Sequence, residues 1–115
     1  MADYNIGDLV SEFLYQMDVK DVFGVVSVHN IPMLDAIGRR NFIKMVPARG
    51  EMGAGHMADG YARTRNGLGV VFTSTGPGAA NVAGSIVESR FAGSAVLHFT
   101  GPVSYTHLRA HESDS

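Results

Sequence analysis

The sequence predicts an α/β fold in which helices cover both faces of a parallel sheet, and two observations support this. Segments with helical periodicity alternate with short strand-like segments through residues 6–100. The strand-like segments are continuous apolar runs, such as GVVFT at 69–73, without alternation of apolar and polar residues. Continuous runs are typical of strands buried on both faces, and helix–strand alternation is typical of parallel connections.

The first half of the chain supplies two helices and two strands. Asn5 is the expected N-cap of a first helix, whose apolar residues recur at three- and four-residue steps. A buried strand at 21–28, a short helix from Asn30 to about Gly38 and a second strand at 42–46 follow. The apolar stripe of the first helix consists of Ile6, Leu9, Val10, Phe13, Leu14 and Met17.

The second half continues the same alternation. Asn66-Gly67 is a typical helix end, so a third helix is expected to stop there. The expected elements are a helix at 51–65, a strand at 69–73, a tight loop at 74–78, a helix at 79–90 and a strand at 95–100.

Composition and charge exclude several classes of function. A formal charge of −2 provides no basic surface, so we expect neither nucleic acid nor an anionic membrane as a partner. The chain has no Cys, which removes disulfides and thiolate metal sites and fits a reducing compartment. The N-terminal residues carry acids and no long apolar run, so we expect no signal peptide, no membrane span and a cytoplasmic location.

Four loops follow the expected strands, at the edge of the sheet where parallel sheets bind their ligands. They comprise residues 27–30, 47–51, 74–78 and the residues from 101 onward. His29 lies on the first loop, where it either contacts a ligand or caps the next helix.

Glu51 begins a helix built mostly of Gly, Ala and Met. The helix dipole favours an acid in the first turn, and for an isolated helix that explanation suffices. However, Gly53, Gly55 and Gly60 each destabilise a helix relative to Ala, which indicates close packing against another backbone. If that packing forms an interface, Glu51 is buried beside it and becomes a candidate general acid or base.

The histidines predict no metal site. His56 has no second ligand at a suitable spacing, so we expect a packing residue. His98, inside a strand, is expected to be a hydrogen-bonded core residue. His107 and His111 form an i, i+4 pair, but they lie in a polar C-terminal run that shows no period continuing the fold.

The segment TSTGPGAAN at 73–81 follows a strand and opens a helix. Gly76-x-Gly78-x-x-Asn81 is close to the dinucleotide-binding pattern, so a stand-alone nucleotide-binding module is one alternative. Against it, Pro77 removes an N–H from the loop, and no acidic residue closes the next strand to bind a ribose hydroxyl. A tight turn without a ligand is a further interpretation.

Three stretches carry a resemblance to a known family. They are VFGVVSVHNIPMLDAI, RGEMGAGHMADGYARTRNGLGVVFTSTGPGAANVAGSIVES and VLHFTG, and they lie within residues 5–103. They resemble the N-terminal pyrimidine-binding domain of thiamine-diphosphate-dependent enzymes, in the group of acetolactate synthase and the 2-oxo acid decarboxylases. The most specific parts are Glu51 with Ala58-Asp59-Gly60-Tyr61-Ala62-Arg63, and Thr75-Gly76-Pro77-Gly78-x-x-Asn81.

The resemblance implies a role for Glu51. The matching glutamate hydrogen-bonds N1′ of the cofactor's aminopyrimidine ring, which promotes loss of the proton at C2 of the thiazolium and attack on a 2-oxo acid. The resemblance also implies a homodimer or higher assembly, in which the helix from Glu51 to Arg63 packs against its copy. It places Thr75, Gly76, Pro77 and Asn81 near the pyrimidine, and Ser27, Val28 and His29 on the substrate side.

The sequence departs from the family pattern in two places near the site. Val26-Ser27-Val28-His29 stands where many relatives have Pro-Gly-Gly, which makes His29 a candidate determinant of the substrate. Gly50 stands where many have His before the glutamate. The particular 2-oxo acid, the use of FAD, and the choice among decarboxylation, ligation and oxidation stay open.

Family members are several times longer, and a separate domain binds their Mg²⁺ and diphosphate. We therefore expect residues 1–103 to form a pyrimidine-binding domain truncated at its C-terminal side. Residues 104–115 are expected not to belong to the fold, and the chain alone is expected to be inactive. An inert subunit of a split thiamine-diphosphate enzyme is a further alternative.

Overall fold

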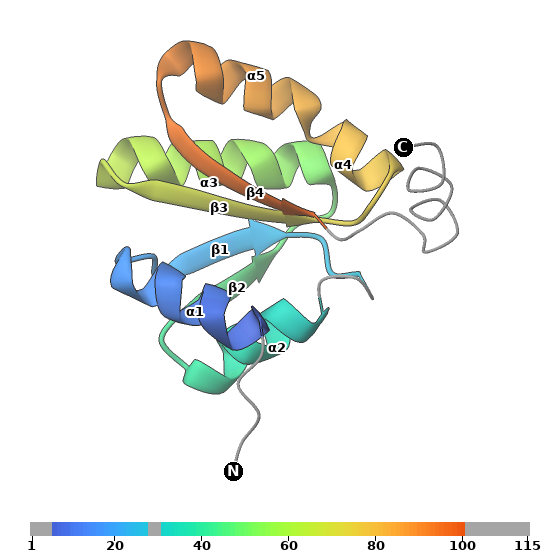
Figure 1. Cartoon of the computed structure of the whole chain (residues 1–115). Helices are drawn as coiled ribbons and strands as arrows, with labels where there is room; N and C mark the ends of the chain where they lie inside the picture. The colour runs from blue at the N-terminus through green and yellow to red at the C-terminus, as the bar shows by residue number, and fades with distance from the viewer. Residues whose placement is uncertain (1–5, 28–30, 101–115) are drawn as a thin grey trace, which may run out of the picture.

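A computed structural model describes residues 6–27 and 31–100 of the chain. Four strands form one sheet in the order β2-β1-β3-β4, and all its strand pairs are parallel. The predicted α/β class with a parallel sheet is therefore confirmed (Figure 1). The elements are α1 (Ile6–Gln16), β1 (Asp21–Gly24), α2 (Ile31–Arg40), β2 (Lys44–Pro47), α3 (Glu51–Arg65), β3 (Leu68–Thr73), α4 (Pro77–Asn81), α5 (Ala83–Ala92) and β4 (Ala95–Thr100).

Several predictions from the sequence fall outside the described residues. They concern the N-cap Asn5, the loop residues Val28, His29 and Asn30, the pair His107 and His111, and the tail at 104–115.

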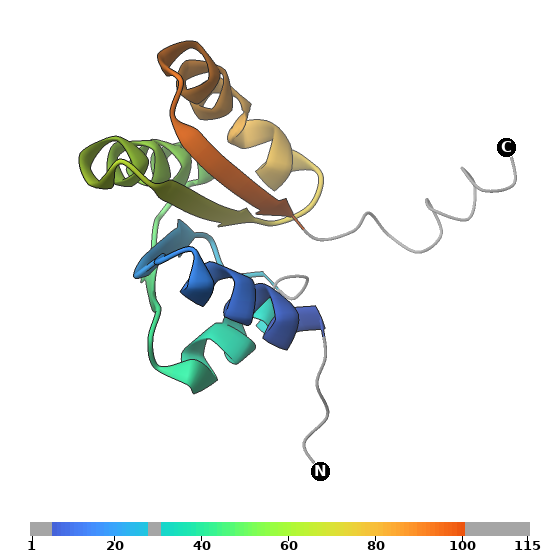
Figure 2. The same cartoon turned by 60° about the vertical axis from the view of Figure 1, so that its left-hand side comes forward.

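Helices cover both faces of the sheet, as predicted. Successive side chains of a strand point to opposite faces, so Val70 and Phe72 of β3 face one way and Val71 faces the other. The first face packs against α1 and α2 through Leu14 and Ile37. The second face packs against α3 and α5, and its cluster comprises Phe23, Ala54, Ala58, Val71 and Val82. Figure 2 shows the two helix pairs on either side of the sheet.

The buried face of α1 differs from the predicted stripe. Leu14 is buried, but its buried neighbours on the helix are the small residues Gly7 and Ser11. Asp8, next to Gly7, forms an ion pair of 3.1 Å with Arg39 of α2. Four members of the predicted stripe, Ile6, Leu9, Phe13 and Met17, are exposed.

The first two strands are displaced from their predicted limits. β1 stops at Gly24, well before residue 28, because its pairing with β2 ends where Gly24 meets Pro47. Ala48 N–H donates to the Gly24 carbonyl at 2.8 Å and closes that ladder. β2 begins after Phe42, whose ring packs against Tyr15 at 4.8 Å between centroids instead of joining the sheet.

The helix predicted at 79–90 is divided into two. α4 begins at Pro77, and Val82 (φ −87°, ψ −8°) separates it from α5. Val82 is buried against α3. The break between α4 and α5 therefore lies at a residue that packs against α3. In contrast, α3 has the predicted limits, and Asn66 ends it in the left-handed conformation at φ 52°. In the described part of the chain, no helix is long and apolar enough to cross a membrane.

Candidate active site at the carboxyl ends of the strands

Glu51 and the loop after β3 meet at the carboxyl ends of the strands. Glu51 is the first residue of α3, which follows β2, while α4 follows β3. The Asn81 side-chain amide donates to Glu51 Oε1 over a long 3.4 Å. A Cβ built on Gly78 would lie 3.3 Å from Glu51 Oε2, so the other carboxylate oxygen faces the backbone of the loop. The structure thus brings together the two motifs that the sequence separates.

The loop itself is a tight turn that runs directly into α4. Gly76 has φ 60° and ψ −116°, a backbone conformation that residues with a Cβ rarely adopt. Pro77 occupies the first turn of α4, where its missing N–H leaves no hydrogen bond unmade. Gly78 N–H donates to the Thr75 carbonyl at 3.3 Å, and Thr75 is half-buried. A Cβ on Gly76 would meet no atom of the described residues within 4 Å, so the space beside this glycine is open.

Hydroxyl groups hold the start of this loop. Thr73 Oγ1 and Thr100 Oγ1 donate to the Ser74 carbonyl at 3.1 and 3.0 Å. His98 Nε2 lies 2.7 Å from Thr73 Oγ1, which confirms the prediction of a hydrogen-bonded His98. Burial lowers the pKa of His98 below its ordinary value. Thr73 and Thr100 were not predicted as site residues, although hydroxyl residues at the ends of two strands are a signal that the sequence contains.

The small residues of α3 fall into two groups. A Cβ on Gly55 would overlap Ser85 Oγ and lie 2.8 Å from Val82 Cγ2, so Gly55 permits close packing against α5. A Cβ on Gly53 or Gly60 would meet no atom of the described residues within 4 Å. The close packing that the sequence predicted is therefore found inside this chain at one of three glycines. Glu51 itself is half-buried here.

A groove of about 600 Å³ lies between α3 and α5 on the outer surface. His56 and Gly60 share this face of α3, as their spacing predicts. His56 is exposed in this chain. The prediction that it is a packing residue is therefore not confirmed within the described part of the chain. The groove is lined by Met52, His56, Asp59, Gly60, Arg63, Gly84 and Glu88.

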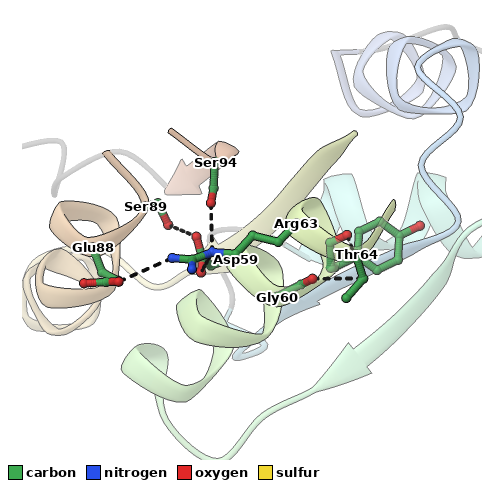
Figure 3. Close-up of polar contacts among 8 residues, drawn as sticks. Asp59, Gly60, Arg63, Thr64, Glu88, Ser89 and Ser94 are labelled. Atoms are coloured by element: carbon green, nitrogen blue, oxygen red, sulfur yellow. Dashed lines mark hydrogen bonds and ion pairs between the residues drawn. The ribbon is translucent and has the colours of Figure 1, made fainter. Parts of the chain in front are cut away.

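Asp59 is the buried centre of a polar network between α3 and α5 (Figure 3). Ser89 donates to Asp59 Oδ1 at 2.8 Å, and Arg63 Nε lies 2.8 Å from Oδ2. Burial opposes ionisation of Asp59, but hydrogen bonds from Ser94 and Ser89 and the charge of Arg63 outweigh it and lower its pKa. Asp59 is therefore held as a carboxylate that ties the two helices together.

Tyr61 belongs to the same Ala-Asp-Gly-Tyr-Ala-Arg segment of α3 as Asp59, and it contacts the opposite end of the sheet. Its hydroxyl accepts hydrogen bonds from the N–H groups of Lys20 and Asp21 at 2.8 and 3.3 Å. Its ring packs edge-on against Phe23 at 5.6 Å, and Arg65 lies over the ring at 5.1 Å from the centroid. The Ala-Asp-Gly-Tyr-Ala-Arg segment thus orients α3, and Glu51 lies at the far end of that helix.

Of the three residues predicted to lie on the substrate side, the structure describes Ser27. Ser27 is half-buried, and its carbonyl accepts a hydrogen bond from Ile31 N–H at 3.1 Å. Val28 and His29 lie outside the described residues, so their roles stay predictions. Within residues 6–27 and 31–100, no group of three or more His, Asp or Glu side chains could hold a metal ion.

A glutamate at a helix start, facing a glycine turn at the carboxyl ends of parallel strands, is the arrangement that the sequence assigned to a pyrimidine-binding domain. The chain belongs to the family described as "Thiamine pyrophosphate enzyme, N-terminal TPP binding domain", whose model matches residues 4–115. The family that the sequence motifs suggested is therefore confirmed.

The chain is also similar to individual curated proteins. It is 33% identical over 102 residues to the "Acetolactate synthase catalytic subunit, mitochondrial" of Aspergillus candidus, covering 89% of this chain and 15% of that protein. It is 37% identical over 95 residues to the "Acetolactate synthase large subunit" of Lactococcus lactis, covering 83% and 16%. With the "Alpha-keto-acid decarboxylase" of Mycobacterium bovis it shares 35% identity over 98 residues, covering 85% and 17%. The chain thus spans less than a fifth of the length of these relatives.

Proposed function

We propose that this chain is the pyrimidine-binding half-site of a thiamine-diphosphate-dependent 2-oxo acid decarboxylase or carboligase of the acetolactate synthase type. The observation that carries the proposal is the convergence of Glu51, Asn81 and Gly78 at the carboxyl edge of the sheet. The family match and the names of the relatives support it. The whole protein would accordingly be a lyase or a transferase.

The residues at this edge fit an aminopyrimidine ring. Glu51 is half-buried, with one oxygen near the Asn81 amide and the other facing Gly78. This carboxylate would hold and return a proton at N1′ of the ring, which requires it to lie within hydrogen-bond reach of that atom. Thr75, Gly76, Pro77 and Asn81 would bind the ring, and Ser27, Val28 and His29 would lie on the side of the 2-oxo acid.

Thiamine diphosphate, when bound, supplies a thiazolium that accepts the electron pair released from the 2-oxo acid. Mg²⁺ would bind with the diphosphate in a separate domain, outside the residues of this chain. The Glu51 carboxylate beside the glycine turn disfavours the alternative of a nucleotide there, because it would repel a phosphate group.

We further propose that α3 packs against its copy in a homodimer or higher assembly. The open positions beside Gly53 and Gly60, and the groove that α3 forms with α5, support this partner. Such an interface would exclude water from the half-buried Glu51. We expect a cytoplasmic location, while the names of three fungal relatives specify mitochondria.

We propose domain limits of 1–103, with residues 104–115 outside the fold. Removal of residues 104–115 is then expected to leave the melting temperature unchanged. A substantial decrease would assign these residues to the domain. The 115-residue chain alone is expected to show no 2-oxo acid decarboxylation when thiamine diphosphate and Mg²⁺ are added.

Exchange of the C2 proton of the bound cofactor tests the role of Glu51. In a full-length protein that carries this domain, Glu51→Gln is expected to slow the exchange by about 10²–10⁴-fold, the usual contribution of a general acid or base. Glu12→Gln is a matched control, because Glu12 lies on α1, which covers the opposite face of the sheet from α3. Exchange at the wild-type rate in Glu51→Gln would exclude the proposed role. A protein that binds the cofactor tightly and never exchanges C2 would favour the inert-subunit alternative.

A further inference from the structure

Three contacts between α3 and the α4–α5 segment follow one register. Asn81 contacts Glu51 at 3.4 Å, and Ser89 contacts Asp59 at 2.8 Å, with the same sequence separation of 30 residues. Gly55 lies between these pairs on α3, and a Cβ built on it would lie nearest to Ser85, which is midway between Asn81 and Ser89. Partners on each segment thus recur every four residues. We call this line of three contacts the α3–α5 seam.

The seam follows from helix geometry. Residues four apart lie on the same face of a helix, one above the other, so two parallel helices in contact can repeat one pairing along their length. Gly55 permits close approach because it has no Cβ, but this contact has little directionality. The contact between Ser89 and Asp59 is a buried, directional hydrogen bond to a charged group, which is the stronger kind. This contact therefore selects the register.

We propose that Asp59 and Ser89 are positioning residues for the pair Glu51 and Asn81. A slip of α5 by one residue along α3 would move Ser89 by about 1.5 Å along the helix and rotate it by about 100°. Asn81 would be displaced with it, because Val82 alone joins α4 to α5. The contact between Asn81 and Glu51, already 3.4 Å long, does not survive such a displacement. The importance of this pair for catalysis rests on the proposed function, but the register itself does not.

The outer part of the network does not share this role. Arg63 reaches Glu88 at 3.3 Å, and their side chains are 46% and 59% exposed. Ion pairs between exposed side chains contribute little, because water screens them and their side chains lose entropy. Figure 3 shows Glu88 at the edge of the network, with Asp59 and Ser89 at its centre. Glu88 therefore provides a control that changes the same network without changing the seam.

Solution NMR of the 115-residue chain tests the proposal without cofactor. The side-chain amide signals of Asn81 are expected to shift when Glu51 is replaced by Gln, since the two groups are in contact. In the background of Ser89→Ala, the same Glu51→Gln replacement is expected to cause a shift smaller by about half or more, because a hydrogen bond weakens steeply as its geometry is lost. Ser89→Thr, which retains the hydroxyl, is expected to restore the shift, and Glu88→Gln to leave it unchanged.

The outcomes separate positioning from general stability. If the Asn81 shift in Ser89→Ala equals that of the wild type, the proposal is wrong, whatever happens to the melting temperature. If Ser89→Ala does not fold, Ser89→Cys, whose thiol is a weaker donor, is used for the same comparison, and an unchanged shift again overturns the proposal. In the full-length enzyme, Ser89→Ala should lower kcat more than it raises KM for the 2-oxo acid. Failure of the proposed function would remove that kinetic effect but not the NMR effect.

Discussion

Nε2 of His98 lies 2.7 Å from Oγ1 of Thr73, and this contact joins the edge strand β4 to the last residue of β3. The Thr73 hydroxyl donates to the Ser74 carbonyl, so its oxygen accepts a hydrogen bond from the Nε2–H group of His98. Neutral imidazole satisfies this arrangement. Because Ser74 opens the turn that faces Glu51, His98 supports that turn through the Thr73 hydroxyl.

We expect the stability of the chain to decrease as the pH falls below about 6.5, the ordinary pKa of histidine. Burial lowers the pKa of His98 in the folded chain, so in this range the unfolded chain binds more protons than the folded one. The loss grows until the pH passes below the folded pKa. Urea unfolding between pH 7 and pH 5 measures it. His98→Gln should have a flatter profile, and an identical slope in this variant would contradict the assignment.

The glycines of α3 are expected to respond in opposite ways to replacement by Ala. Gly55→Ala should destabilise the chain by about 1–3 kcal/mol, because the added methyl group overlaps Ser85 and Val82. Gly53→Ala is the matched control on the same helix and should stabilise it by about 0.5–1 kcal/mol, because its Cβ enters open space. Denaturant titration of both variants measures these changes in the free energy of unfolding. Equal effects would mean that α3 and α5 do not pack as described.

Tyr61→Phe should destabilise the chain by roughly 0.5–1.5 kcal/mol for each lost hydrogen bond. The substitution retains the ring contact with Phe23 but leaves the N–H groups of Lys20 and Asp21 without the hydroxyl acceptor. Tyr15→Phe is the control, since Tyr15 is 44% exposed. Amide hydrogen exchange at Lys20 and Asp21 should accelerate in Tyr61→Phe, and unchanged exchange there would count against this role.

Gly53→Leu tests the proposed contact of α3 with a second subunit. The larger side chain has space in a single chain but would separate two copies that meet at Gly53. Gly38→Leu on α2 is matched to it, because a Cβ there also meets no described atom within 4 Å. Sedimentation of the full-length protein should show weaker association only for Gly53→Leu. Equal association of both variants would place the interface elsewhere.

The elements that the sequence located well are those whose signals are local. α3 has the predicted limits because an acid begins it and Asn66 ends it in the left-handed conformation. β4 also matches its prediction, since its apolar run is bounded by turn residues. The first helix was located correctly, but its buried face carries Gly7 and Ser11 in place of most of the predicted apolar stripe. The spacing of apolar residues within one helix does not show which of its faces packs against a neighbouring helix such as α2.

The sequence by itself determined the class of fold, the family and the residues on which the candidate site depends. Those features follow from the order of short segments and from two motifs, Glu51 with its small-residue helix and the Thr75–Asn81 turn. Only the tertiary structure decided that Asn81 contacts Glu51, that Gly55 packs inside the chain and that Ser89 donates a hydrogen bond to Asp59. The physical reason is that each of these contacts joins residues about 30 positions apart, and their geometry depends on how two helices pack on one face of the sheet.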